Sequence, residues 1–148
     1  DGCMTGQLIS VGYEGRSVDE LIASLIDQGV SFLVDVRLTP LSRKPGLSKK
    51  RLAQALAEHC INYLHLPALG NPKDNRAALR SGDPASHKRF AELLHTDAGA
   101  TALSHVAELL DDQTDALLCF ERSHSQCHRQ LVADQLSRTV DELRLVMV

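Results

Sequence analysis

The sequence predicts a single three-layer α/β domain with a mainly parallel sheet of about five strands and helices on both faces. Short apolar runs alternate along the chain with segments whose apolar residues recur at helical spacing, which is typical of βαβ units. Crossover connections between such strands place helices on both faces of a parallel sheet. The chain has 148 residues, an ordinary length for one domain, and 43% of them are hydrophobic and can form its core.

The chain starts with a predicted strand, a helix and a second strand. Residues 7–13 are a short apolar, β-leaning run. Residues 17–29 carry a helical apolar stripe, which Ser17 opens as part of a capping box and Gly29 ends as a C-cap. Residues 30–37 form a nearly continuous apolar run, typical of a strand buried on both faces.

The middle of the chain predicts one further helix and strand between two loops. Two prolines hold residues 38–46 in an extended loop. Residues 48–60 form an amphipathic helix and residues 61–66 a third strand. Residues 67–86 contain three prolines and several turn-forming clusters, and a loop of this length in a small domain usually has a function.

The last part of the chain predicts three helices and two strands. Residues 87–96 and 99–112 have helical periodicity. Residues 115–120 are an apolar run that predicts the fourth strand, residues 126–140 a helix, and residues 143–148 the last strand.

The ends and the apolar runs of the sequence bear on domain limits and location. We assign residues 1–8 to leader or tag residues and the start of the first strand, and residues 9–148 to the single domain. The longest apolar runs are too short to span a membrane, so we expect a cytoplasmic protein with no membrane partner. Four irregularly spaced cysteines do not resemble a disulfide framework, and we expect them to be reduced.

The distribution of charge is more informative than the net charge of −3. No acidic residue occurs between Val36 and Ala57, whereas six basic residues do. A locally positive face on a mildly acidic protein predicts an anionic ligand of limited size.

Polar residues follow several of the predicted strands. In open parallel sheets, ligands bind outside the carboxyl ends of the strands, so these residues should meet at one edge. We predict that Arg37, Arg43, Arg129 and Arg16 bind the anion. Asp35, Tyr13 and Cys119 would support this site.

The segment "LLCFERSHSQCHR", residues 117–129, concentrates reactive side chains. Ser123 with Gln126 forms a possible capping box that places Cys127 in the first turn of a helix. There the helix dipole and Arg129 would favour the thiolate, with His128 as general base. We therefore predict Cys127, Glu121 and His128 as catalytic residues, and Cys127 as a more reactive thiol than Cys119.

Two other interpretations of this segment remain open. Cys127 can be a small buried residue of the helix, with His128 and Arg129 in solvent. A zinc site would use Cys119, Glu121, Cys127 and His128. No C-x-x-C pair is present, and neighbours on a helix point about 100° apart. We therefore expect no metal, and the sequence identifies no cofactor.

Four segments together resemble one family, the domain of unknown function 488 (DUF488). They are "ISVGYEGRSVDELI", "LVDVRLTPLSRKPGLSKKRLAQAL", "INYLHLPALGN" and "LLCFERSHSQCHRQLVADQL". The resemblance runs from about Ile9 to Val140 and rests on the combination of these pieces in order. It implies a fold and a set of marked positions, but no reaction.

Two functional hypotheses follow. In the first, the protein is an enzyme that acts on a phosphate-bearing or nucleotide-like substrate, through a Cys/Glu/Arg site at the carboxyl edge of the sheet. In the second, it is a non-catalytic module that binds a nucleotide or nucleic acid in the same basic pocket. A deep cleft would favour the first hypothesis, and a shallow, broad basic face the second.

Overall fold

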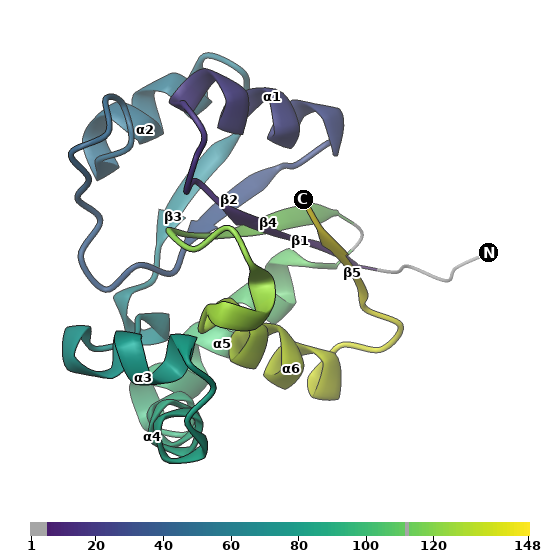
Figure 1. Ribbon diagram of the computed structural model, residues 1–148. Helices are drawn as coiled ribbons and strands as arrows, with labels where there is room; N and C mark the ends of the chain where they lie inside the picture. Colours follow the sequence, from purple (N-terminus) through teal and green to yellow (C-terminus); the bar gives the residue numbers. More distant parts are fainter. Residues whose placement is uncertain (1–5, 112) are drawn as a thin grey trace.

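Five parallel strands form the centre of the computed structural model, which describes residues 6–111 and 113–148 (Figure 1). The strands are β1 (Gln7–Gly12), β2 (Phe32–Asp35), β3 (Asn62–His65), β4 (Thr114–Cys119) and β5 (Arg144–Met147). Their spatial order is β3-β2-β4-β1-β5, and every neighbouring pair is parallel. The predicted α/β class is confirmed, and the strand expected at 115–120 lies in the middle of the sheet.

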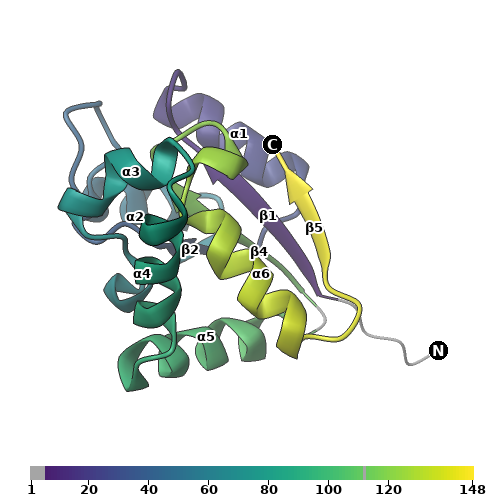
Figure 2. The same ribbon diagram turned by 60° about the horizontal axis from the view of Figure 1, so that its bottom comes forward.

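Helices cover both faces of this sheet, which gives three layers (Figures 1 and 2). On one face lie α1 (Val18–Asp27) and α2 (Lys49–Ala57). On the other lie α4 (Pro84–Leu94), α5 (Asp97–Leu109) and α6 (Arg129–Thr139), with the short α3 (Arg76–Arg80) beside them. The single-turn 3₁₀ helices are η1 (Pro67–Leu69), η2 (Lys73–Asn75) and η3 (His124–Gln126).

Alternate residues of the central strands pack in two separate apolar cores, one on each face of the sheet. Leu33 and Leu118 belong to the core under α1 and α2, whereas Val34 and Leu117 belong to the core under α4–α6. All four are completely buried, as the apolar runs predict. Because side chains alternate along a strand, the polar residues that follow these runs are also divided between the two faces.

The segment 67–86 is more ordered than its prolines and turn residues suggest. It contains η1, η2 and α3, and α4 begins at Pro84 rather than at the predicted position 87. The cause is local, because the Asp83 carboxylate accepts a hydrogen bond from the Ala85 N–H (3.0 Å) and Pro84 occupies the first helical turn. This segment therefore forms a fixed wall beside the carboxyl ends of the strands.

The predicted start of α6 is wrong by three residues. Residues 124–126 form η3, Cys127 is extended (φ −123°, ψ 151°), and His128 is the N-cap residue of a helix that begins at Arg129. The side chain of Ser123 makes no cap hydrogen bond. Cys127 is thus outside the helix, and the prediction of a thiol in its first turn is wrong.

Residues 1–8 were expected to hold leader or tag residues and the start of the first strand. Residues 1–5 lie outside the described residues, and β1 begins at Gln7. None of the helices in the described part of the chain has the length and apolar character needed to cross a bilayer.

Candidate functional site

A pocket of about 200 Å³ lies at the carboxyl edge of the sheet. It is bounded by the residues that follow β1, β2 and β4 and by α3 and the segment before it. Its wall is formed by Tyr13, Arg37, Leu38, Thr39, Leu41, Asn71, Arg76, Leu79, Arg80, Cys119, Phe120, Glu121, Gln126 and His128. The position agrees with the rule that open parallel sheets bind ligands beyond their strand ends.

Close backbone packing fixes the loop that carries Glu121. A Cβ on Gly12 would lie 1.8 Å from the Glu121 carbonyl oxygen, so only glycine fits at the end of β1. Arg129, which is completely buried, donates from Nη2 to that same carbonyl (2.7 Å) and from Nε to Ser10 Oγ (2.8 Å). The first residue of α6 therefore anchors the backbone from which Glu121 extends.

Glu121 is ionised at neutral pH and faces α3 across the pocket. Its carboxylate accepts a hydrogen bond from Arg80 Nη2 at 3.0 Å, which is also an ion pair. Burial alone would raise the pKa of Glu121, but hydrogen bonding, chiefly from Arg80, outweighs burial and holds the pKa below its usual value. This carboxylate can accept a proton from a bound molecule.

Cys119, the last residue of β4, is the thiol on the pocket wall. Its Sγ lies 3.9 Å from Glu121 Oε1 and 3.9 Å from His128 Nδ1. The sequence predicts only a supporting role for Cys119, but of the two cysteines near the site it is the one that reaches the pocket.

Cys127 lies behind this wall and is 1% exposed. Burial, reinforced by contact with Cys119, raises the pKa of its thiol well above the ordinary value, although His128 partly opposes this effect. The expected activation by a helix N-terminus is absent because Cys127 precedes the helix. Burial and the position of Cys127 before the helix therefore both argue against the prediction that Cys127 is the more reactive thiol.

His128 is held in one orientation by the end of β2. Its Nε2 lies 2.8 Å from the Val36 carbonyl, so Nε2 carries the proton and donates it. Its ring packs edge-on against Phe90 with 5.2 Å between the centroids. The other nitrogen, Nδ1, then presents a lone pair 3.5 Å from Cys127 Sγ and 3.9 Å from Cys119 Sγ.

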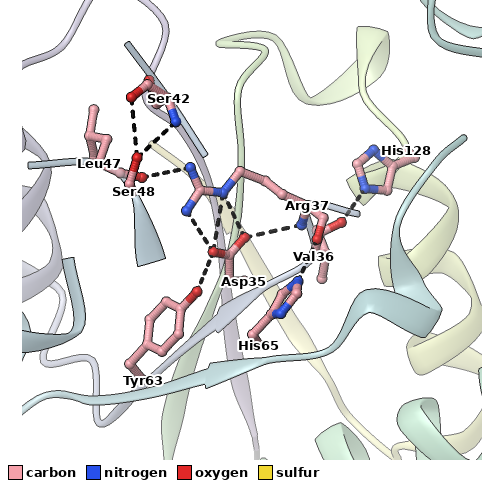
Figure 3. A network of polar contacts seen from close by, with 9 residues as sticks. All are labelled: Asp35, Val36, Arg37, Ser42, Leu47, Ser48, Tyr63, His65 and His128. Carbon is pink, nitrogen blue, oxygen red and sulfur yellow. Dashed lines mark hydrogen bonds and ion pairs between the residues drawn. The ribbon is translucent and has the colours of Figure 1, made fainter. Parts of the chain in front are cut away.

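Arg37 reaches the pocket wall, but Asp35 neutralises its charge (Figure 3). The guanidinium donates to the Asp35 carboxylate through Nε and Nη2, the latter at 2.7 Å, and both side chains are buried. Burial works to lower the pKa of Arg37, but the bonds to Asp35 overcome this and raise it. Tyr63 Oη donates to the same carboxylate at 2.6 Å, and Arg37 Nη1 donates to the Leu47 carbonyl at 2.7 Å. The Asp35–Arg37 pair thus connects the end of β2 to Tyr63 on β3 and to the backbone at Leu47.

The other predicted anion-binding arginines are outside the pocket wall. Arg43 is exposed on the loop after β2. Arg16 is buried after β1, where burial and then the nearby Arg122 and Arg129 lower its pKa. Of the predicted anion-binding and catalytic residues, Arg37, Glu121 and His128 line the pocket, whereas Arg16, Arg43, Cys127 and Arg129 do not.

Sequence reasoning missed the two arginines of α3. Arg76 and Arg80 line the pocket opposite the strand ends. The length and composition of residues 67–86 indicated a functional segment, but α3 was not predicted there. Their spacing of four residues places both on one face of the helix, which was a detectable signal.

One group of side chains in the described residues has the composition of a metal site. The Sγ atoms of Cys119 and Cys127 and a ring nitrogen of His128 all lie within 4.8 Å of one another, and all three residues are buried. The objection that Cys127 and His128 diverge on a helix does not apply, because Cys127 is extended.

The family model described as "Domain of unknown function DUF488" matches residues 17–136. The chain belongs to the DUF488 family. This match covers most of the chain and includes every residue of the pocket wall except Tyr13. No curated protein and no solved structure matches this chain.

Membership of DUF488 therefore confirms the resemblance seen in the four sequence segments and adds no reaction to it. The pocket combines a thiol, an imidazole and a carboxylate at the strand ends with two arginines on α3.

Proposed function

We propose that this protein is an enzyme that acts on a small phosphate-bearing or otherwise anionic substrate bound in the pocket at the carboxyl edge of the sheet. Arg76 and Arg80 would bind the anion, and Glu121 would act as general base. Cys119 and His128 would form the reacting end of the pocket.

This proposal rests on which arginines of the pocket wall are paired with carboxylates and which are not. Arg37 is neutralised by Asp35, and Arg80 is paired with Glu121. Arg76 has no carboxylate partner among residues 6–111 and 113–148. One cation on the wall is thus available to an anionic group.

Arg80 can also turn to a ligand. Its side chain is 49% exposed, whereas that of its partner Glu121 is 13% exposed, so Arg80 is the mobile member of the pair. A phosphate group, by contrast, can accept two parallel hydrogen bonds from a guanidinium. Release of Glu121 by Arg80 would also make the carboxylate a stronger base at the moment the substrate binds.

The size of the pocket favours a small substrate. Pockets for drug-sized ligands occupy roughly 300–1,000 Å³. The volume of about 200 Å³ suits a phosphate with a few attached carbon atoms better than a complete nucleotide. A concave pocket of this size also supports an enzyme over a module that binds nucleic acid on a broad basic face.

Titration of the purified protein with inorganic phosphate, followed by calorimetry, tests the binding step. We expect the double variant Arg76→Gln/Arg80→Gln to bind phosphate at least about tenfold more weakly than the wild type, since hydrogen bonds to charged groups contribute roughly 1.5–3 kcal/mol each. Arg89→Gln is the matched control, because Arg89 is an exposed arginine in a 3.0 Å ion pair with Asp74, away from the pocket wall. Equal phosphate affinity in all three proteins would overturn the proposal.

The chemical step is tested by screening small phosphate esters for turnover. Glu121→Gln should keep phosphate binding within a few-fold and lower turnover by about 10²–10⁴, the usual contribution of a general base. A short single-stranded oligonucleotide distinguishes the nucleic-acid hypothesis. Oligonucleotide binding that is independent of Arg76 and Arg80, together with no phosphate binding, would favour that hypothesis instead.

A further inference from the structure

Two thiols and an imidazole meet at the inner end of the pocket, and their spacing is that of metal ligands. Zinc bonds of about 2.3 Å to sulfur and 2.0–2.1 Å to nitrogen in a tetrahedron separate a sulfur from a nitrogen ligand by about 3.6 Å. The two observed Sγ–Nδ1 distances are 3.5 Å for Cys127 and 3.9 Å for Cys119. Both agree with a zinc site to within about 0.3 Å.

The imidazole of His128 is already oriented as a ligand. Its Nε2–H donates to the Val36 carbonyl at 2.8 Å, and this bond leaves the lone pair on Nδ1, directed at the two sulfur atoms. Figure 3 shows the ring of His128 directed at Val36 at the end of β2. Histidine ligands of metals almost always donate their second N–H to a carbonyl or carboxylate in this way.

The three residues come from places that hold them rigidly. Cys119 ends the central strand β4, and Cys127 and His128 lie between η3 and α6. The backbone changes from extended at Cys127 to helical at His128, and Cys127 Sγ lies 3.5 Å from His128 Nδ1. A site that is rigid before the metal arrives loses little conformational entropy when the metal binds.

The three ligands are not equally accessible. Cys119 and His128 are on the pocket wall, whereas Cys127 lies behind it. A metal between them would therefore be closed by protein on the side of Cys127 and open toward the pocket. Three protein ligands with one open position are the pattern of catalytic zinc, in contrast to the four ligands of structural zinc.

We propose that Cys119, Cys127 and His128 bind one zinc ion, with its fourth coordination position open to the pocket. Binding releases the two thiol protons to solvent and forms two zinc–thiolate bonds and one zinc–imidazole bond. The fourth position takes a water molecule, near which Glu121 is placed as the base. Assignment of this position to the reaction rests on the proposed function, whereas metal binding itself does not.

Metal binding is tested on metal-free protein by titration with Co²⁺ and then Zn²⁺. We expect one ion per chain, with Co²⁺ giving the sulfur-to-metal charge-transfer absorption of two thiolates and the strong visible bands of a tetrahedral site, both of which Zn²⁺ removes. Cys127→Ser and Cys119→Ser should each weaken Zn²⁺ binding by more than about 100-fold, because loss of even an outer-shell partner costs roughly 10–100-fold.

Cys60→Ser is the matched control, because Cys60 is an exposed thiol between α2 and β3. It should bind Zn²⁺ as the wild type does. If the buried Cys127→Ser variant fails to fold by circular dichroism, Cys119→Ser decides the question. Absence of thiolate charge-transfer absorption, or Zn²⁺ affinity unchanged in Cys119→Ser, overturns the proposal.

The zinc site and the proposed function fail in different measurements. Zn²⁺ binding without phosphate binding would overturn only the anion pocket. Phosphate binding that depends on Arg76 and Arg80, in a protein that takes up neither Co²⁺ nor Zn²⁺, would overturn only the zinc site.

Discussion

At the scale of single residues, the environment of each side chain decides what it can do. Arg37 and Arg76 both line the pocket, but a buried carboxylate neutralises the first, whereas no carboxylate in the described part of the chain pairs with the second. Cys119 and Cys127 both approach His128, but only Cys119 reaches the pocket. Residue type at the edge of the sheet is therefore a weaker guide to function than the partners of each side chain.

Differences in burial predict the order in which the described cysteines react. In metal-free protein, iodoacetamide should modify the exposed Cys60 first, the pocket-facing Cys119 more slowly and Cys127 last, since burial removes access and raises the pKa of the Cys127 thiol. Peptide mapping after alkylation between pH 5 and 9 measures this order. Labelling of Cys127 ahead of Cys119 would contradict it, and urea-unfolded protein, in which all thiols react, is the control.

The buried Asp35–Arg37 pair should be far more important for stability than an exposed pair. Arg37→Met leaves the Asp35 carboxylate buried without its cation, which costs roughly 3–5 kcal/mol of unfolding free energy. Arg89→Met breaks the exposed pair with Asp74 and should cost no more than about 1 kcal/mol. Urea unfolding of both variants measures the difference, and equal losses would show that the Asp35–Arg37 pair is not needed for folding.

At the scale of elements, the ends of the helices determine which side chains reach the edge of the sheet. The capping box at Ser17 is present in both directions, with Glu20 N–H donating to Ser17 Oγ and Ser17 N–H to the Glu20 carboxylate. The similar pattern at Ser123 makes no cap, because η3 intervenes and α6 starts later. That shift of a few residues moves Cys127 from a helical turn to the extended connection beside His128.

The two serines provide a direct test of this difference. Ser17→Ala should lower the unfolding free energy by about 1 kcal/mol, the usual effect of losing an N-cap side chain. Ser123→Ala should change it by less than about 0.5 kcal/mol, since this side chain is exposed and bonds only to Ser125 Oγ among the described contacts. Thermal or urea unfolding measures both variants, and a loss at Ser123 as large as that at Ser17 would restore the predicted helix start.

At the scale of the whole molecule, the parallel sheet gathers functional groups at its carboxyl edge and leaves an unusual carboxylate near the other edge. Asp115, the second residue of β4, is completely buried, and its Oδ2 has no hydrogen-bond partner among the described residues. Burial raises its pKa to about 7, against weaker opposition from the Phe32 backbone and the Gln113 side chain. The folded protein therefore binds this proton more tightly than the unfolded chain does.

The pH dependence of stability follows from that difference. Between about pH 4 and pH 7 the folded state keeps the Asp115 proton while the unfolded state releases it, so the contribution of this group to stability falls as pH rises. Asp115→Asn removes the effect. The unfolding free energy of Asp115→Asn minus that of the wild type should rise between pH 4 and pH 8. The rise should reach up to about 4 kcal/mol, because each unit of pKa difference corresponds to about 1.4 kcal/mol. Urea unfolding at both pH values measures this change, and an unchanged difference would place the Asp115 pKa in its ordinary range.

The sequence by itself determined the architecture and indicated the edge at which the candidate site lies. Apolar runs alternating with amphipathic segments require a parallel sheet with helices on both faces, and the strand ends then place Arg37, Cys119 and Glu121 near one another. Ser17 is the N-cap of α1 as predicted, and Gly29 (φ 70°) directly follows the C-cap Gln28, because capping depends on residues a few positions apart. Such signals are local and can be read from the order of residues.

Only the tertiary structure decided the partners of the functional side chains. The bond from His128 to Val36 joins residues 92 positions apart, and the ion pair of Arg80 with Glu121 joins residues 41 positions apart. Partners at such separations depend on how α3, α4 and α6 pack on the sheet, and helical or strand periodicity carries no information about that packing. For this reason the sequence indicated the carboxyl edge, but the arginines of α3 and the grouping of two thiols with one imidazole became visible only in the folded chain.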